Sequence, residues 1–562
     1  MVWVLGILWV PHQPHETGAT LVKDGRIVAS INEDRLTGVK HDSSLPINSV
    51  KEVLRIANID PSQIDAVTIP FENPTWYYMR SLNIKNVLRI PHALIENRTL
   101  RAYLKGFGID CPVYYVNHHL SHAASAYYTS GWNEATVITM DGTGDGIAST
   151  VYVGKDGDLR EIAKTPEKDS PGFFYAKATA AIGFKANDGE GKTMGLACYG
   201  NPDILYAEVA KLIDVRDLKF VGNFGKTMYS HKIDFTDGKL FARYRYDTSF
   251  MSDNPFMKFV GKYKNEDIAA AAQKVLEDVA VKLVKNAVKI TKMPKVCLAG
   301  GVALNVKINQ RIKENDSVED VFIHPNPGDA GVQAGSALYM CNKIMREQGS
   351  FKPWRMEHVY YGSEYSDEEI EIENFGLAFE KLASPAKTGA ELVDSGKVVG
   401  WFQGRLEYGP RALGNRSVVA DPRVAGMRDR INKYLKKRDW FMPFAPSMLA
   451  ERHSEYSVKA TDAPFMILAF DATEQANKDI PAVVHVDKTL RPQTVKREIN
   501  QPYYDLIKEF ENRTGVGAVL NTSFNKHGLP MIMKPKDAID HLVWGCVEEL
   551  IISKYRVFRK FK

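Results

Sequence analysis

The stretch ATVITMDGTGDGIASTVYVGKDGDLREI (135–162) determines the fold that the sequence predicts. It reads as an apolar strand, a glycine-rich polar loop and a hairpin that turns at Asp156-Gly157. Asp-Gly between apolar runs favours a tight hairpin because such a turn needs positive φ. A similar series occurs earlier, as VWVLGILWV (2–10), a polar loop and ATLVKDGRIVASI (19–31). The two series together predict a duplicated fold.

Helices and strands alternate after this stretch. Residues 266–290 have strong helical periodicity, KVCLAG (295–300) reads as a short strand, and a second strand and a small-residue helix follow within 321–338. The alternation predicts an α/β protein, a sheet flanked by helices. Residues 347–366 break the periodicity, so we expect a first domain over 1–355 and a second α/β domain over 367–562.

Composition excludes several classes of protein. The 562 residues are 44% hydrophobic and 25% charged, which is typical of a globular protein and not of collagen or a disordered chain. A net charge of +5 is small for this length and argues against a dedicated nucleic-acid-binding protein. Five cysteines without CxxC spacing argue against zinc knuckles and fit a reducing compartment. No apolar run is long enough to span a bilayer, and we expect a cytoplasmic protein.

The segment NHHLSHAAS (117–125) carries the strongest local signal. On a helix, His118 and His122 share one face, a spacing that suits two ligands of one metal ion. Asp141 ends the next strand and Asp329 lies in a comparable loop, PGDAG. Two imidazoles and two carboxylates suit iron(II), manganese or zinc. The alternative is a histidine pair that only packs or hydrogen-bonds.

Glycine-rich loops and an arginine-rich loop indicate anion binding. Loops at 142–146, 189–195 and 300–301 follow strands, where backbone N–H groups cradle phosphates. In the second domain, GRLEYGPRALGNRS (404–417) separates its arginines with Gly, Pro and Asn, which excludes a solvated helix stripe. A fixed loop of this kind suits polyphosphate or carboxylate, which arginine grips with two N–H groups. A surface salt-bridge loop is the alternative.

His15 follows the first strand, within HQPHETG. If the duplicated halves face one another, it opens onto the same cleft as the metal ligands. A neutral imidazole there could accept a proton from a hydroxyl group, although an ordinary loop histidine is the alternative.

The chain resembles the NodU/CmcH family of O-carbamoyltransferases along its whole length. The matching motifs include HETGATLVKDG, NHHLSHAASA, MDGTGDG, GEGKTMGLACYG, LAGGVALN, GDAGVQAGSAL, GRLEYGPRALGNRS and LNTSFN, in family order. The resemblance implies an actin-like, sugar-kinase-like (ASKHA) first domain and a YrdC-like second domain. It implies an ATP-dependent enzyme that forms carbamoyl adenylate from carbamoyl phosphate and ATP, with Mg²⁺, and transfers the carbamoyl group to a hydroxyl of a natural-product acceptor such as an antibiotic.

The resemblance also implies roles for individual residues. His15 would be the acceptor-side base and Lys40 would contact the adenylate. An iron(II)-like ion would be held by His118, His122, Asp141 and Asp329. ATP and carbamoyl phosphate would be handled by Arg411, Arg416, Lys436, Arg491, Asn521 and Ser523. Carbamoyl adenylate would meet first-domain loops at Gly144, Asp145, Gly300, Gly301 and Asn305.

Three positions depart from the family pattern: Met442 stands before PFAP in place of a basic residue, Cys198 replaces a proline and Lys488 replaces a glycine. Two other functions stay open. One is a small-molecule kinase on the same fold, which would yield ADP, and the other is a nucleotide- or RNA-binding module. We expect no membrane or nucleic-acid partner, and a homodimer is one assembly that the sequence allows.

Overall fold

The computed structural model describes residues 1–9, 16–73, 90–225, 229–236, 239–246, 253–370 and 377–560. The chain divides into two compact units. The first comprises residues 1–33 and 41–356, and the second comprises residues 34–40 and 357–562. The short segment 34–40 therefore belongs with the C-terminal unit although it lies near the start of the chain. In these ranges, no helix combines the length and apolar character needed to cross a bilayer.

The first sheet of the N-terminal unit has the strand order β3-β2-β1-β4-β5. Neighbouring β1, β2 and β3 are antiparallel, whereas β4 runs parallel to β1 and β5 parallel to β4. Every residue of β1 is buried, which explains its continuous apolar sequence. The strands are β1 (Trp3–Leu8), β2 (Gly18–Lys23), β3 (Arg26–Asn32), β4 (Ala66–Ile69) and β5 (Val113–Tyr115).

The second sheet repeats this arrangement. Its order is β14-β13-β6-β7-β8, with β6, β7 and β8 antiparallel and with β13 and β14 parallel to β6. The strands are β6 (Glu134–Gly144), β7 (Ile147–Lys155), β8 (Asp158–Pro166), β13 (Lys295–Ala299) and β14 (Asp320–Ile323). In both sheets the first strand pairs with a hairpin partner on one side and with a parallel strand on the other. The repeated hairpin agrees with the duplication that the two sequence series predicted.

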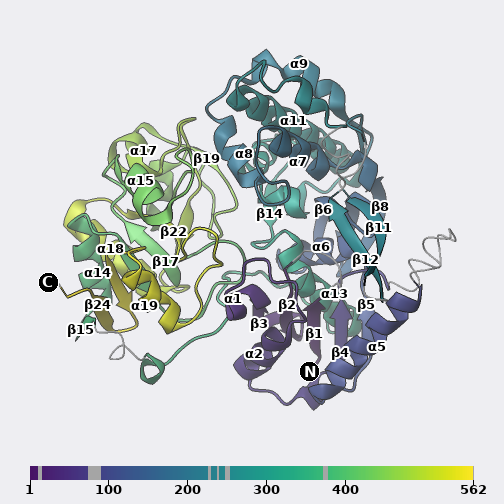
Figure 1. Ribbon diagram of the computed structural model, residues 1–562, viewed down its shortest axis with the longest axis horizontal. Coiled ribbons are helices and arrows are strands. Elements are labelled where there is room, and N and C mark those ends of the chain that lie inside the picture. The colour runs from purple at the N-terminus through teal and green to yellow at the C-terminus, as the bar shows by residue number, and fades with distance from the viewer. Residues whose placement is uncertain are drawn as a thin grey trace. The chain divides into compact units, whose positions relative to one another are not determined.

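Two helices pack closely together in this unit, α6 (His118–Tyr127) and α13 (Val332–Glu347) (Figure 1). A Cβ atom on Gly335 of α13 would lie 1.8 Å from the Ser121 carbonyl oxygen of α6. A Cβ on Gly6 of β1 would lie 2.0 Å from the Gln333 carbonyl oxygen. Glycine at both positions lets α13 approach the helix and the strand closely, which fixes the position of α6.

Further helices described in the first unit pack against the sheets and against one another. The long helix α11 buries an alanine- and valine-rich face, in agreement with its helical periodicity. The helices are α2 (Ile47–Ala57), α5 (Ile90–Gly106), α7 (Pro171–Ala181), α8 (Glu190–Ala197), α9 (Tyr206–Val209), α11 (Asn265–Thr291) and α12 (Val306–Lys313). Two hairpins, β9 (Ile213–Arg216) with β10 (Lys219–Gly222) and β11 (Tyr229–Thr236) with β12 (Lys239–Tyr246), complete the unit.

The C-terminal unit contains an eight-stranded mixed sheet of order β15-β24-β23-β16-β17-β22-β18-β21. Its core surrounds the fully buried Trp401. The strands are β15 (Ala378–Lys381), β16 (Val399–Phe402), β17 (Arg416–Ala420), β18 (Ala445–Leu449), β21 (Gln493–Val495), β22 (Ala518–Ser523), β23 (Glu549–Ile552) and β24 (Tyr555–Phe558). The main helices are α14 (Pro385–Asp394), α18 (Gln501–Thr514) and α19 (Pro535–Val543), with shorter α1 (Glu33–Thr37), α15 (Met427–Arg430), α16 (His453–Tyr456) and α17 (Glu474–Asp479).

Candidate metal centre and anion pocket

Four side chains predicted as metal ligands converge in the N-terminal unit. Their ligand atoms all lie within 4.8 Å of one another. The Nε2 atom of His118 lies 3.3 Å from an Asp141 oxygen and 3.4 Å from an Asp329 oxygen. The Nε2 atom of His122 lies 3.3 Å from the same Asp329 oxygen. The fold therefore brings together ligands that are far apart in the sequence. Helix α6 supplies both histidines, β6 supplies Asp141, and the turn after β14 supplies Asp329.

The electrostatics of this cluster favour a bound cation. Burial disfavours the charged form of His118, but the Asp329 and Asp141 carboxylates outweigh it and raise its pKa to about 10. Burial and the Asp329 charge would raise the pKa of Asp141, yet the two histidines outweigh them and hold it below its usual value. Two carboxylates facing two imidazole nitrogens fit a divalent ion, whose charge they would balance.

A surrounding group of backbone contacts orients these ligands. The Gly301 N–H donates to Asp141 Oδ1 at 2.8 Å, and the His118 N–H donates to Asp145 Oδ2 at 2.8 Å. Asp145 also accepts the Glu72 N–H at 3.1 Å. Two residues predicted to meet carbamoyl adenylate, Asp145 and Gly301, thus contact metal-ligand residues in the structure.

Two further glycines are required by close packing. A Cβ on Gly144 would fall 2.0 Å from the His118 ring, and a Cβ on Gly300 would fall 2.2 Å from the Met140 carbonyl oxygen. Gly300 also has a φ of 95°, which disfavours any side chain.

Asn305 caps α12 by accepting the Ile308 N–H at 3.3 Å, and it exchanges amide hydrogen bonds with Gln273.

His119, the middle histidine of the motif, has a structural role in this arrangement. Its Nε2 lies 2.8 Å from the Ile147 carbonyl oxygen, so that nitrogen carries the proton. Its Nδ1 lies 2.7 Å from the Thr139 hydroxyl. Burial and the neighbouring His118 lower its pKa to about 3, so it stays neutral and ties α6 to β6 and β7.

His15 and Lys40 are the other two residues that the sequence predicted to act in the transfer reaction. His15 falls outside the described residues, so its predicted role as a base stays a prediction. Lys40 is exposed and ends the segment 34–40. In that segment Arg35 donates to the carbonyl oxygen of Gly409 at 3.3 Å, and Gly409 belongs to the arginine-rich loop (404–417) of the same unit.

Three arginines of the C-terminal unit form a cationic group. Burial lowers the pKa of Arg411 to about 10. Burial, together with the positive charges of Arg411 and Arg438, lowers the pKa of Arg491 well below its usual range. Among the described residues, no acidic side chain pairs with Arg411 or Arg491, and the buried Nε of Arg411 has no acceptor. Buried guanidinium groups whose positive charge has no acidic partner are typical of a site that binds an anion. Arg438, which follows the arginine-rich loop in the sequence, also belongs to this group.

The other predicted residues of this unit are bonded within the protein. The Arg416 guanidinium donates to the carbonyl oxygens of Gln403, Gly404, Asn415, Ser363 and Met533 and stacks 3.7 Å from the Phe402 ring centroid. Lys436 donates to the carbonyl oxygens of Ser523 and Asn525 and to the Asn525 side chain. All three N–H groups of Lys436 are used by these contacts, and the Arg416 side chain is fully buried.

Asn521 and Ser523 lie at the end of β22. The Asn521 amide donates to the Ala412 carbonyl oxygen at 3.1 Å and to the Ser447 hydroxyl at 2.8 Å. The Ser523 hydroxyl donates to the Asn525 side chain at 2.7 Å. Their donors therefore serve the loop and the strand end around the arginine group.

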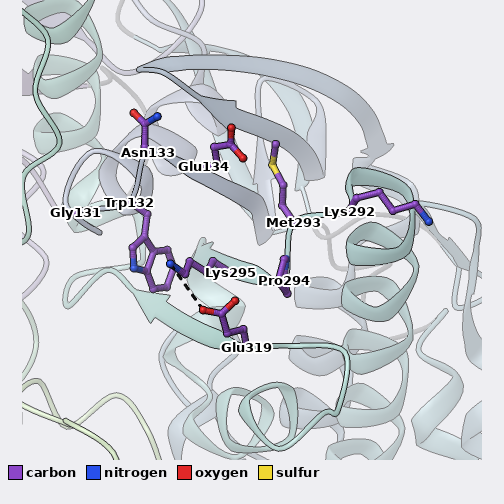
Figure 2. A pocket seen from close by; sticks show the side chains of 9 residues that line it. All are labelled: Gly131, Trp132, Asn133, Glu134, Lys292, Met293, Pro294, Lys295 and Glu319. Carbon is purple, nitrogen blue, oxygen red and sulfur yellow. Dashed lines mark ion pairs between the residues drawn. The ribbon is translucent and has the colours of Figure 1, made fainter.

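A separate cavity of about 480 Å³ lies where the strands β6, β13 and β14 of the second sheet begin, at the opposite strand ends from the metal-ligand cluster (Figure 2). Its lining residues precede or begin β6, β13 and β14, whereas Asp141 and Gly300 lie at the opposite ends of β6 and β13. Lys295 and Glu319 form an ion pair at 3.8 Å across it, and Trp132 supplies an indole wall. The cavity contains none of the predicted site residues.

Family models and known proteins match the chain over most of its length. The model described as "Carbamoyltransferase N-terminus" matches residues 5–338, and "Carbamoyltransferase C-terminus" matches residues 390–559. Nodulation protein NolNO of Sinorhizobium fredii is 34% identical over 97% of this chain and 79% of its own length. Nodulation protein NolO of Bradyrhizobium diazoefficiens is 33% identical over 79% of each chain.

Solved structures show a weaker likeness. Full-length HypF in its phosphate- and nucleotide-bound form has 17% identity and a TM-score of 0.33, over 63% of this chain and 56% of its own. Component A of the Acidaminococcus fermentans (R)-2-hydroxyglutaryl-CoA dehydratase has 18% identity and a TM-score of 0.33, over 61% of this chain and 99% of its own. The family assignment therefore rests on the sequence matches and not on these structures. The chain belongs to the NodU/CmcH family of carbamoyltransferases and is a carbamoyltransferase enzyme.

Proposed function

We propose that the C-terminal unit makes carbamoyl adenylate from ATP and carbamoyl phosphate. The observation that carries this proposal is the group formed by Arg411, Arg438 and Arg491, where two guanidinium groups lack an acidic partner among the described residues. Triphosphate and carbamoyl phosphate would supply the missing negative charge. Donors fixed at the charge that develops on a leaving group contribute on the order of 100- to 1,000-fold in rate each.

The proposed reaction has three steps. Water cleaves carbamoyl phosphate to carbamate and inorganic phosphate. A carbamate oxygen then attacks the α-phosphorus of ATP, which enters with Mg²⁺, and pyrophosphate leaves. The hydroxyl oxygen of a small-molecule acceptor attacks the carbamoyl carbon, AMP leaves, and the hydroxyl proton passes to a base, for which His15 is the candidate.

The N-terminal unit would carry out the transfer to the acceptor. We propose an actin-like, sugar-kinase-like fold for it, which the repeated strand order supports, and a YrdC-like fold for the C-terminal unit. His118, His122, Asp141 and Asp329 would hold an iron(II)-like ion, which when bound would polarise a carbamoyl or phosphate oxygen. Asp145 and Gly301 would keep His118 and Asp141 in the orientation that this requires.

The decisive experiment identifies the products. The protein is incubated with ATP, carbamoyl phosphate and a panel of alcohols, and the expected products are AMP, pyrophosphate, phosphate and an alcohol heavier by one carbamoyl group. Formation of ADP would instead indicate a kinase.

Two variants locate the steps. Arg491→Ala should abolish AMP formation, whereas Arg513→Ala, a matched loss of an exposed arginine paired with Asp394, should leave it unchanged. His15→Asn should keep AMP formation and lose transfer to the alcohol. Wild-type carbamoylation by His15→Asn would rule out its role as the base.

A further inference from the structure

We propose that Glu407 is a positioning residue that holds the arginine-rich loop in the shape needed to bind an anion. One carboxylate oxygen, Oε1, accepts the backbone N–H groups of Leu413 and Asn415 at 2.8 Å each and of Arg416 at 3.1 Å. Backbone N–H groups that converge in this way usually bind an anionic ligand. Here a side chain of the protein occupies that place permanently.

The opposite side of the loop is held equally firmly. The Leu413 carbonyl oxygen accepts from the Tyr360 hydroxyl and the Gln493 amide at 2.8 Å each. The Ala412 carbonyl oxygen accepts from Asn521, and the Gly414 N–H donates to the Ser417 hydroxyl at 3.0 Å. A loop bonded on both sides has few conformations left, so the side chain of Arg411, next to Ala412, leaves it in a fixed direction.

These contacts define what binds the ligand. The N–H groups of Leu413, Asn415 and Arg416 are all used by Glu407, so they are not available to a phosphate. The anion must then be held by side chains, above all the Arg411 guanidinium with Arg491. Glu407 contributes to affinity by fixing Arg411 and not by touching the ligand.

A second explanation is that Glu407 only supplies a negative charge for the buried Arg416, whose pKa it raises against the effect of burial. Glu407 is 2% exposed, and its Oε2 atom has no hydrogen-bond partner among the described residues. The two explanations differ for Glu407→Gln, which removes the charge but keeps an oxygen acceptor for the three N–H groups. The positioning role of Glu407 rests on the proposed anion pocket, and the test is chosen so that a failure of this role and a failure of the proposed function give different results.

The test measures binding of inorganic pyrophosphate to the full-length protein by calorimetry. Glu407→Ala should weaken binding about tenfold or more, which corresponds to one lost charge-assisted contact. Glu407→Gln should stay within about threefold of the wild type, a difference of under 1 kcal/mol. Glu511→Ala, which removes another buried carboxylate of the same unit, should not change affinity even though it lowers the melting temperature.

A double-mutant cycle separates positioning from general destabilisation. In an Arg411→Ala protein, adding Glu407→Ala should change pyrophosphate affinity little, because the residue that Glu407 positions is already gone. If Glu407→Ala does not fold, Glu407→Asp replaces it: its shorter side chain cannot reach all three N–H groups and should weaken binding.

Three results would overturn the inference: wild-type affinity in Glu407→Ala or Glu407→Asp, equal losses in Glu407→Gln and Glu407→Ala, or additive losses in the cycle. Failure of the wild type to form AMP would refute the proposed function, and the pyrophosphate comparison would still stand.

Discussion

The Nε2 atom of His122 lies 3.0 Å from the Nε2 atom of His118. Two imidazole nitrogens at this distance, with carboxylates on either side, repel unless a proton or a cation lies between them. The two residues are one turn apart on α6, which brings their rings together. Asp145 accepts the His118 backbone N–H, and Gly144 leaves the space that the His118 ring occupies.

His122→Ala is therefore expected to lose bound metal. Removing an outer contact of a metal site typically weakens binding about 10- to 100-fold, so losing a direct ligand should cost at least that much. Metal content measured by mass spectrometry after dialysis checks this. His453→Phe, a change of a buried histidine in the other unit, should retain the wild-type content, and equal metal in both variants would contradict the assignment.

Gly144→Ala should have a similar effect without touching a ligand. The added methyl group would lie 2.0 Å from the His118 ring, so the ring must move away from Asp141 and Asp329. We expect weaker metal binding in a titration of the metal-free protein. Gly106→Ala is the control, because its methyl group meets nothing within 4 Å. Unchanged metal affinity in Gly144→Ala would show that the ring is not held there.

Arg411 and Arg416 should behave differently although both belong to one motif. Arg416→Leu removes donors to five carbonyl oxygens and leaves them buried, so it should lower the free energy of unfolding by about 3 kcal/mol or more. Arg411→Ala should preserve stability and abolish AMP formation. Melting temperature and product analysis on the two variants check this, and the opposite pattern would contradict it.

His453 should make the C-terminal unit sensitive to acid. Burial lowers its pKa to about 4, although Asp462 partly opposes this. A histidine with a depressed folded-state pKa binds protons more readily when unfolded, so its contribution to stability is complete above pH ~6.5 and is lost as the pH falls towards 4. At pH 5 the loss is about 2 kcal/mol. Urea unfolding at pH 7.5 and pH 5 should show a smaller difference for His453→Phe than for the wild type, and equal differences would exclude the effect.

Lys488→Gly should stabilise the protein. Lys488 has a φ of 58°, in the left-handed region, and its side chain is exposed. This conformation explains why the family pattern has glycine there, and replacing lysine should gain roughly 0.5–1 kcal/mol. Lys478→Gly, in the short helix α17, should have the opposite sign. A lower melting temperature for Lys488→Gly would contradict the expectation.

Much of the fold could be predicted because it follows local patterns. The Asp-Gly turns at 24–25 and 156–157 both have positive φ and join antiparallel strands, as their sequences indicate. Helical spacing placed His118 and His122 on one face. That Asp329 lies beside them, about 200 residues later, followed from an equivalent loop position after a strand.

Other features depend on contacts that leave no local pattern. Arg416 and Lys436 look like phosphate ligands in the sequence, but carbonyl oxygens from distant segments, such as those of Met533 and Ser523, take up their donors. Glu407 carries no motif beyond its place among the arginines, and its role appears only with the three N–H groups in place. The sequence shows which residue types are present. Whether the N–H groups of a side chain are already bonded inside the protein depends on the folded backbone.

The early segment 34–40 has a practical consequence for dissecting the enzyme. A cut after Met356 would leave these seven residues on the wrong fragment, away from the unit they pack with, and would remove the Arg35 bond to Gly409. The C-terminal fragment 357–562 expressed alone should therefore be less stable than the same fragment with residues 34–40 fused to it.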